Sequence, residues 1–105
     1  MPSSERDVLY ELESQLFIWD KIKAERNKTK HGISFEEAAT VFMIDGAEEF
    51  EDTSHSDDEE RIIVIGLSRG MRILTVVHCW RENDMIIRII SARKATSLEE
   101  KLWKR

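Results

Sequence analysis

Cysteine, proline and glycine are all scarce in this chain of 105 residues. The single cysteine, Cys79, excludes an internal disulfide bond and any zinc cage built from several cysteines. The only proline is residue 2 and glycine occurs four times, so regular elements joined by short polar turns are expected. No apolar run approaches the ~20 residues that cross a bilayer, and the charged start does not resemble a secretory signal. We therefore expect one compact cytoplasmic domain.

Negative charge predominates in the first sixty residues and positive charge in the rest. Residues 1–60 contain six Lys/Arg and seventeen Asp/Glu, a net −11, whereas residues 61–105 contain ten and four, a net +6. Within the acidic half, residues 21–31 are basic, with five Lys/Arg against Glu25 alone. The fold could have a basic face that suits RNA and an acidic rim that suits a basic partner, or the segregation could serve only solubility.

Capping residues mark the ends of three predicted helices, over residues 21–30, 35–42 and 95–104. Asp20 is a good N-cap for the first helix, and Gly32 can end it in a left-handed conformation. Ser34 and Glu37 form a capping box at the start of the second, in which each side chain satisfies a free backbone N–H. The first helix is poor in apolar residues, so it should lie shallowly on the core and expose basic side chains.

The N-terminal residues 1–15 are predicted to be an extension of the domain, which then covers residues 16–105. Ser4 can cap a short helix in this extension, because apolar residues follow it at helical spacing up to Leu16.

Short apolar runs predict β-strands, at residues 16–19, 48–52, 61–67, 72–80 and 85–92. Turns at residues 68–70, where Gly70 supplies a positive φ, and at residues 81–84 force the last three strands into an antiparallel meander. Residues 53–58 form a polar turn. The meander strands are apolar on both faces, so three helices are expected to cover one face and a partner can close the other. The predicted fold class is α+β, with an antiparallel sheet packed against about three helices.

The sequence has no motif for a phosphate-binding loop, a serine nucleophile or a metal site. The glycines are isolated, and His31, His55 and His78 lie too far apart in the chain to act as a pair of metal ligands. The acidic run at residues 53–60 lacks the spacing and the glycine of a calcium loop. We therefore expect no metal ion and no cofactor.

Positive and titratable side chains cluster instead near the ends of predicted elements: Lys23, Lys30, His31, Arg61, Arg88, Arg93 and Lys94. The start of the 61–67 strand and the end of the 85–92 strand flank the middle strand and point the same way, so Arg61 and Arg93 are expected to converge. Such a set suits metal-free RNA cleavage, in which the ribose 2′-OH attacks the adjacent phosphorus and displaces the 5′-oxygen. His31 titrates near neutrality, and arginine binds phosphate through two parallel hydrogen bonds.

Each candidate also has a structural interpretation. His31 precedes a helix-ending glycine, where positive charge is favourable with the helix dipole. Arg61 follows four acids and can pair with one of them, and Arg88, between two isoleucines, can belong to a buried ion pair. The remaining conspicuous side chains are interpreted as structural: Trp19, His78, Cys79 and Trp80.

An ordered set of short segments resembles the BrnT toxin family, from about Phe17 to Glu100. The segments in the first half are Trp19-Asp20, Lys23-Ala24, Asn27, Lys30-His31-Gly32, Ser34 to Ala39 and Val41-Phe42. Those in the second half are Glu60-Arg61, Ile65-Gly66, Arg72, Arg88 to Arg93 and Ala95. Each segment is modest, but their order and spacing make the set specific.

The resemblance implies a RelE-like fold and a ribonuclease toxin of a type II toxin–antitoxin module that acts without a metal and inhibits translation. It also implies a BrnA-like ribbon–helix–helix antitoxin, which neutralises the toxin and lets the complex bind operator DNA. The family pattern covers Lys30, His31, Arg61, Arg88 and Arg93. We predict Lys30, His31, Arg61 and Arg93 as catalytic residues, and Arg88, Lys94 and Lys23 as RNA-binding residues.

Two departures from the family pattern bear on activity. Residues 1–15 precede the usual start, and the final helix has Trp103 where the family often has a tyrosine. A hydroxyl group that could contact RNA is therefore absent. The competing hypothesis is a non-catalytic module that binds an antitoxin-like partner and acts as an operon co-repressor.

Overall fold

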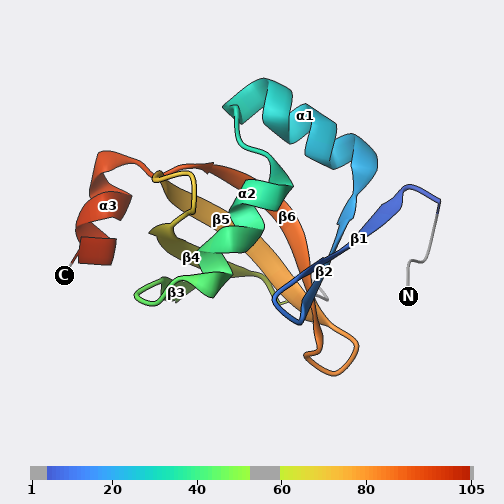
Figure 1. The fold of residues 1–105 in the computed structure, drawn as a ribbon. Coiled ribbons are helices and arrows are strands. Elements are labelled where there is room, and N and C mark those ends of the chain that lie inside the picture. The colour runs from blue at the N-terminus through green and yellow to red at the C-terminus, as the bar shows by residue number, and fades with distance from the viewer. Residues whose placement is uncertain (1–4, 53–59, 105) are drawn as a thin grey trace.

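The computed structural model describes residues 5–52 and 60–104 and confirms the α+β class (Figure 1). Its elements follow one another as β1 (Asp7–Leu12), β2 (Gln15–Asp20), α1 (Lys21–His31), α2 (Phe35–Thr40), η1 (Val41–Met43), β3 (Glu48–Glu51), β4 (Ile62–Leu67), β5 (Ile73–Arg81), β6 (Ile86–Lys94) and α3 (Ser97–Lys104). The strands form one sheet in the order β1-β2-β6-β5-β4-β3. All neighbours are antiparallel except β2 and β6, which are parallel. The predicted meander is therefore confirmed as β4-β5-β6, while the predicted turn at residues 53–58 lies outside the described residues.

The predicted N-terminal helix is wrong, because residues 7–12 form the edge strand β1. Val8, Tyr10 and Leu12 recur with a period of two and pack against the core, as a strand with one buried face requires. Glu13 and Ser14, with φ of 50° and 72°, make the two-residue turn that leads into β2. Ser4, the predicted cap, lies outside the described residues. None of the helices in the described part of the chain is long and apolar enough to span a membrane.

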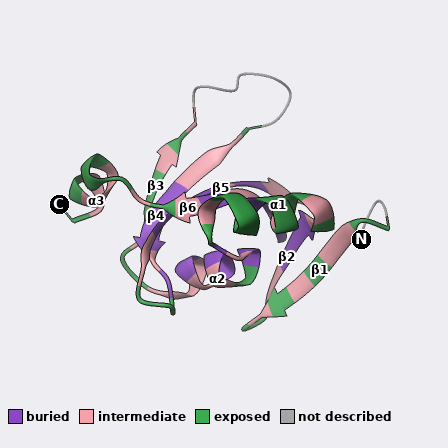
Figure 2. Cartoon of the chain, turned by 90° about the horizontal axis from the view of Figure 1, so that it is seen from above, coloured by how far each residue is buried: buried purple, intermediate pink, exposed green. Residues whose placement is uncertain are grey.

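Two helices cover one face of the sheet, and α3 lies against the other (Figures 1 and 2). Ala38 of α2 is fully buried in a core cluster with Leu74 and Val76 of β5. Thr75 lies between Leu74 and Val76 on β5, so its side chain points to the opposite face of the sheet. There it donates a hydrogen bond to Glu99 of α3. The expectation that all three helices share one face is therefore wrong. Figure 2 shows buried residues in α2 and the central strands, whereas α3 has none.

The buried side chain of Asn27 attaches α1 to the sheet. β2 pairs with β6 only as far as Arg88, and the chain then turns into α1 beside the second half of β6. There the Asn27 amide donates to the Ala92 carbonyl at 2.8 Å and accepts from the Ala92 N–H at 3.1 Å. It also donates to the Ile33 carbonyl at 3.0 Å. One side chain thus takes the place of a missing strand, because both backbone groups of Ala92 would otherwise be buried without partners.

The helix ends agree with the sequence, with two corrections. The Asp20 carboxylate accepts from the N–H groups of residues 22 and 23, and Gly32 ends α1 with a φ of 74°. Ser34 accepts from the Glu37 N–H, but the Glu37 carboxylate does not return the bond; Arg72 and Ser68 bind it instead. In the β4–β5 turn the positive φ of 63° belongs to Met71, not to the glycine before it.

Replacing Asn27 with alanine should lower the free energy of unfolding by about 2–4 kcal/mol, because buried backbone groups lose their hydrogen bonds. Urea unfolding measures this loss. Thr29→Ala, at an exposed position on the same helix, is the control and should change the free energy by less than about 0.5 kcal/mol. Equal effects of the two substitutions would contradict the assigned role of Asn27.

His78 is a core residue, as the sequence interpretation holds. Its side chain is fully buried, and its ring meets the edge of Phe42 with centroids 4.8 Å apart. Neither ring nitrogen has a hydrogen-bond partner among the described residues. Burial lowers the pKa of His78 to about 4, so the ring is neutral in the folded protein at pH 7.

The folded protein should lose stability as the pH falls from about 6.5 towards 4, because the unfolded state binds a proton on His78 that the folded state excludes. The total loss from this group is about 3 kcal/mol below pH 4. Urea unfolding of the wild type and of His78→Leu between pH 7 and 4 measures the contribution of this group. The stability of the variant should depend less on pH. Parallel pH profiles would show that His78 does not titrate between the two states.

Candidate functional site

α1 exposes five cationic side chains: Lys21, Lys23, Arg26, Lys28 and Lys30. None of them forms an ion pair with another described residue, whereas five arginines elsewhere pair with acids, such as Arg6 with Asp20. His31, the last residue of the helix, is half-buried. The helix is therefore a surface of uncompensated positive charge in a chain whose net charge is −5.

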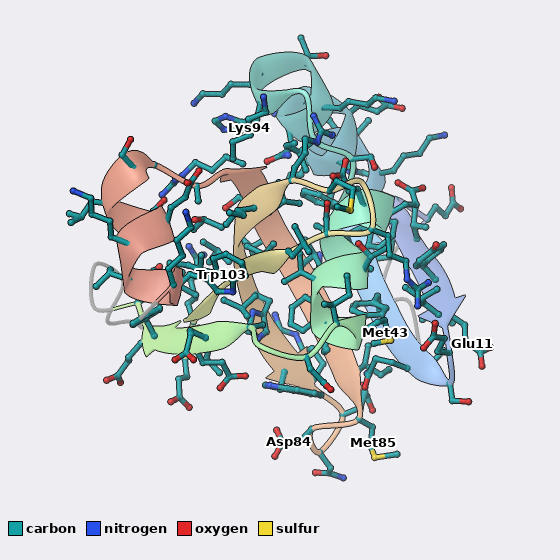
Figure 3. The ribbon with its side chains drawn as sticks, turned by 60° about the vertical axis from the view of Figure 1, so that its left-hand side comes forward. Glu11, Met43, Asp84, Met85, Lys94 and Trp103 are labelled. Carbon is teal, nitrogen blue, oxygen red and sulfur yellow. The ribbon has the colours of Figure 1, made fainter. Side chains whose placement is uncertain are left out.

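The end of β6 lies beside this helix. Asn27 is bonded to Ala92, and three predicted site residues follow within a few positions, Lys30 on α1 and Arg93 and Lys94 on β6. Figure 3 shows the exposed Lys94 at the same end of the molecule as α1, far from the β5–β6 turn at Asp84 and Met85. The structure thus places Lys30, His31, Arg93 and Lys94 at one end of the sheet, with the Arg93 side chain on the α3 face, where Glu99 binds it. Lys23 lies in the first turn of α1, farther from that end.

Arg93 is bound by a carboxylate of α3. Its Nη1 and Nη2 atoms donate to Oε1 and Oε2 of Glu99, both at 2.8 Å. The same carboxylate accepts from the Thr75 hydroxyl and from the Thr96 N–H, which completes the predicted capping box of α3. The hydrogen bonds from Arg93 hold the pKa of Glu99 at about 2, and the pKa of Arg93 is raised in turn. The arginine therefore already binds an anion in the two-pronged geometry that also suits phosphate.

Arg61 does not converge with Arg93, contrary to the sequence prediction. It precedes Ile62, which is level with His78 of β5, whereas Arg93 pairs with Thr75. Four residues along the strands, or about 13 Å, separate the two arginines. The error comes from strand register, because β6 continues past the level at which β4 begins.

Arg88 is instead the residue level with Arg61, since it pairs with Cys79 of β5. Its guanidinium lies 3.5 Å from the Asp7 carboxylate of β1, so the ion-pair interpretation of Arg88 is confirmed. The predicted set is thus divided into Arg61 and Arg88 at mid-sheet, Lys23 in the first turn of α1, and the remaining residues at the end of the sheet.

A second polar cluster, which the sequence reasoning missed as a site, connects the C-terminal end of α1 to α2. Arg72 binds the Glu37 carboxylate through two nitrogens, and its Nη2 also lies 3.5 Å from the Gly32 carbonyl. Ser68 donates to the same carboxylate at 2.6 Å. The bonds from Arg72 lower the pKa of Glu37. Gly70 leaves room for this carboxylate, because a Cβ at that position would lie 2.6 Å from Glu37 Oε2.

Two shallow hollows border α1. One of about 430 Å³ is lined by α1 alone, through Ile22, Glu25, Arg26, Thr29 and Lys30. The other, of about 220 Å³, lies between α1, the start of α2 and strands β1 and β2, and is bordered by Lys28 and Glu36. Within residues 5–52 and 60–104, no three His, Cys, Asp or Glu side chains lie together so that they could hold a metal ion.

Comparison with known proteins relates the chain to a sequence family and to a solved structure. Residues 19–99 match the sequence profile of the family described as "Ribonuclease toxin, BrnT, of type II toxin-antitoxin system". The crystal structure of the Brucella abortus ribonuclease toxin BrnT resembles this chain with 25% identity and a TM-score of 0.56, over 75% of this chain and 94% of that chain. No curated protein matches the chain. The family match includes every predicted site residue.

Replacing Glu99 with glutamine should cost about 1 kcal/mol at pH 7, a value reduced by solvent screening because the pair is partly exposed. The pKa of Glu99 is lowered in the folded state, so its stabilisation is present above about pH 4.5 and is lost as the pH falls towards 2. Thermal unfolding of the wild type and Glu99→Gln should therefore converge at low pH. Glu100→Gln, one residue along α3, is the control; a constant difference between wild type and Glu99→Gln at every pH would rule out the ion pair as its source.

Proposed function

Since the chain belongs to the family of BrnT ribonuclease toxins of type II toxin–antitoxin systems, we propose that it cleaves RNA without a metal ion in the cytoplasm and thereby inhibits translation. The observation that supports this most is the end of the sheet where α1 meets β6. There the imidazole of His31, the exposed ammonium groups of Lys30 and Lys94, and the anion-binding Arg93 lie on adjacent elements.

The proposed reaction needs two proton transfers. A base removes the proton of the ribose 2′-OH, the oxygen attacks phosphorus, and an acid protonates the leaving 5′-oxygen. Lys30 and His31 supply these two groups, because both close α1 beside the end of β6. The products are a 2′,3′-cyclic phosphate and a 5′-hydroxyl group.

Arg93 binds the scissile phosphate after the phosphate displaces Glu99. The carboxylate now occupies both prongs of the guanidinium, and phosphate accepts the same pair of parallel hydrogen bonds. Arg93 then stabilises the negative charge that grows on the phosphate oxygens. Arg61 and Arg88 are about 13 Å from Arg93 along the strands, so we assign them, with Lys94 and Lys23, to neighbouring phosphates.

The type II family implies a protein antitoxin, and we propose that it is a BrnA-like ribbon–helix–helix protein whose complex with the toxin binds operator DNA. A strongly acidic edge supports a basic partner: β3 has three glutamates in its four residues. Charge complementarity favours docking of a basic segment there over docking on α1.

Arg93→Ala should lower RNA cleavage by about 10²–10³-fold, because the growing charge on the phosphate loses its donor. The matched control is Glu99→Gln, which breaks the same ion pair but keeps the arginine and should stay active. A defined RNA is incubated with each protein in EDTA, and the product ends are identified. Placing a 2′-deoxy sugar at the cleaved nucleotide should abolish cleavage by the wild type.

Loss of cleavage in EDTA, or products with a 3′-hydroxyl group, would refute the metal-free 2′-OH mechanism. Equal loss of activity in Arg93→Ala and Glu99→Gln would mean that the pair matters for docking of α3 and not for the phosphate. A folded wild type that binds its antitoxin and cleaves neither free RNA nor RNA on translating ribosomes would favour the non-catalytic co-repressor.

A further inference from the structure

One flank of α1 presents a row of positively charged side chains. Lys23, Arg26 and Lys30 recur at intervals of three and four residues, so their side chains project from the same side of the helix. They extend over about 10 Å along its axis. All three are exposed, and none forms an ion pair with a described residue. The hollow that adjoins this row is lined by α1 alone, and it includes one acid: Ile22, Glu25, Arg26, Thr29 and Lys30.

The opposite flank of the helix differs. Lys21 and Lys28 border the smaller hollow, where Glu36 at the start of α2 also lies. That flank faces β1, β2 and α2, so its positive charge is partly offset and its surroundings are crowded by protein. The hollow beside Arg26 and Lys30 is lined by α1 alone, so other elements crowd this flank less.

The row leads towards the end of β6. It ends at Lys30, where Asn27 holds α1 against Ala92, one residue before Arg93. A strand that follows the row is therefore delivered to the end of β6, where Arg93 and Lys94 lie. The helix is capped at both ends and bonded to the sheet through Asn27, so in the closed fold the row points towards the end of β6.

We propose that the row Lys23–Arg26–Lys30 binds the phosphate backbone of single-stranded RNA and guides it towards the end of β6. This inference rests on the proposed ribonuclease function for its ligand. An extended chain of phosphates matches the row because each phosphate has one negative charge and makes salt-dependent contacts with Lys and Arg. The contacts are independent of sequence, so the row sets affinity and register but not base preference.

The test measures binding of a fluorescent single-stranded RNA that has 2′-O-methyl groups and cannot be cleaved by 2′-OH attack. Lys23→Gln/Arg26→Gln removes two charges from the row but spares Lys30, which is assigned to catalysis. Lys21→Gln/Lys28→Gln removes the same charge from the other flank of the same helix. All four positions are exposed, so both variants should fold like the wild type.

The row variant should bind the RNA about tenfold more weakly at low salt. Its slope of log affinity against log salt should fall by about 1.4, which corresponds to two lost phosphate contacts on a single strand. The flank control should bind nearly as the wild type does. Equal weakening in both variants would overturn the proposal, since it would reflect net charge alone.

Unchanged RNA affinity in the row variant, together with weaker binding of the antitoxin, would also overturn the proposal and assign the row to the protein partner. Because the probe is uncleavable, the result is independent of catalysis. If the wild type binds RNA through the row but cleaves none, the proposed ribonuclease activity is refuted and the proposed RNA binding by the row is supported. Active cleavage with an unchanged salt slope in the row variant would refute only the proposed RNA binding by the row.

Discussion

The hydrogen bonds between Asn27 and the backbone of Ala92 determine where α1 lies on the sheet. A six-stranded sheet that loses β2 as a partner halfway along β6 needs something to satisfy the exposed backbone groups. A carboxamide both donates and accepts, as a peptide group does, so asparagine meets this need where an acid or an apolar residue cannot. The position of Lys30, His31 and the basic row relative to Arg93 follows from this single side chain.

Arginine and lysine have separate roles in the molecule. Every ion pair that joins two described residues uses an arginine: Arg6–Asp20, Arg69–Glu13, Arg72–Glu37, Arg88–Asp7 and Arg93–Glu99. Three of these pairs, those of Arg69, Arg72 and Arg88, connect elements far apart in the chain, for which a rigid planar fork is well suited. The lysines of α1 stay in water, where a flexible ammonium group can adapt to a ligand. Arg26 differs from these paired arginines, since it lies among the lysines of α1.

Local signals in the sequence were sufficient for most elements. The caps at Asp20 and Ser34 and the meander turns depend on neighbouring residues, so the sequence alone located them. The N-terminal segment fits either period, and only its pairing with β2 decides for a strand. The candidate site was predicted less well, because the distance between Arg61 and Arg93 depends on register between strands. The partner of Glu37 was also missed, since Arg72 lies 35 positions along the chain.

Because α1 packs shallowly on the sheet, it can open locally without global unfolding. The helix fully buries only Asn27, with Ala24 partly buried against the core cluster, so α1 exposes little apolar surface of its own when it lifts from the sheet. The free energy of such an opening depends little on denaturant concentration, and its heat-capacity change is small. Global unfolding of the core around β5 differs in both respects. Amide hydrogens of α1 therefore exchange with solvent through an event that leaves the sheet intact. The segment that presents the basic row can be reshaped by a ligand while the rest of the fold stays closed.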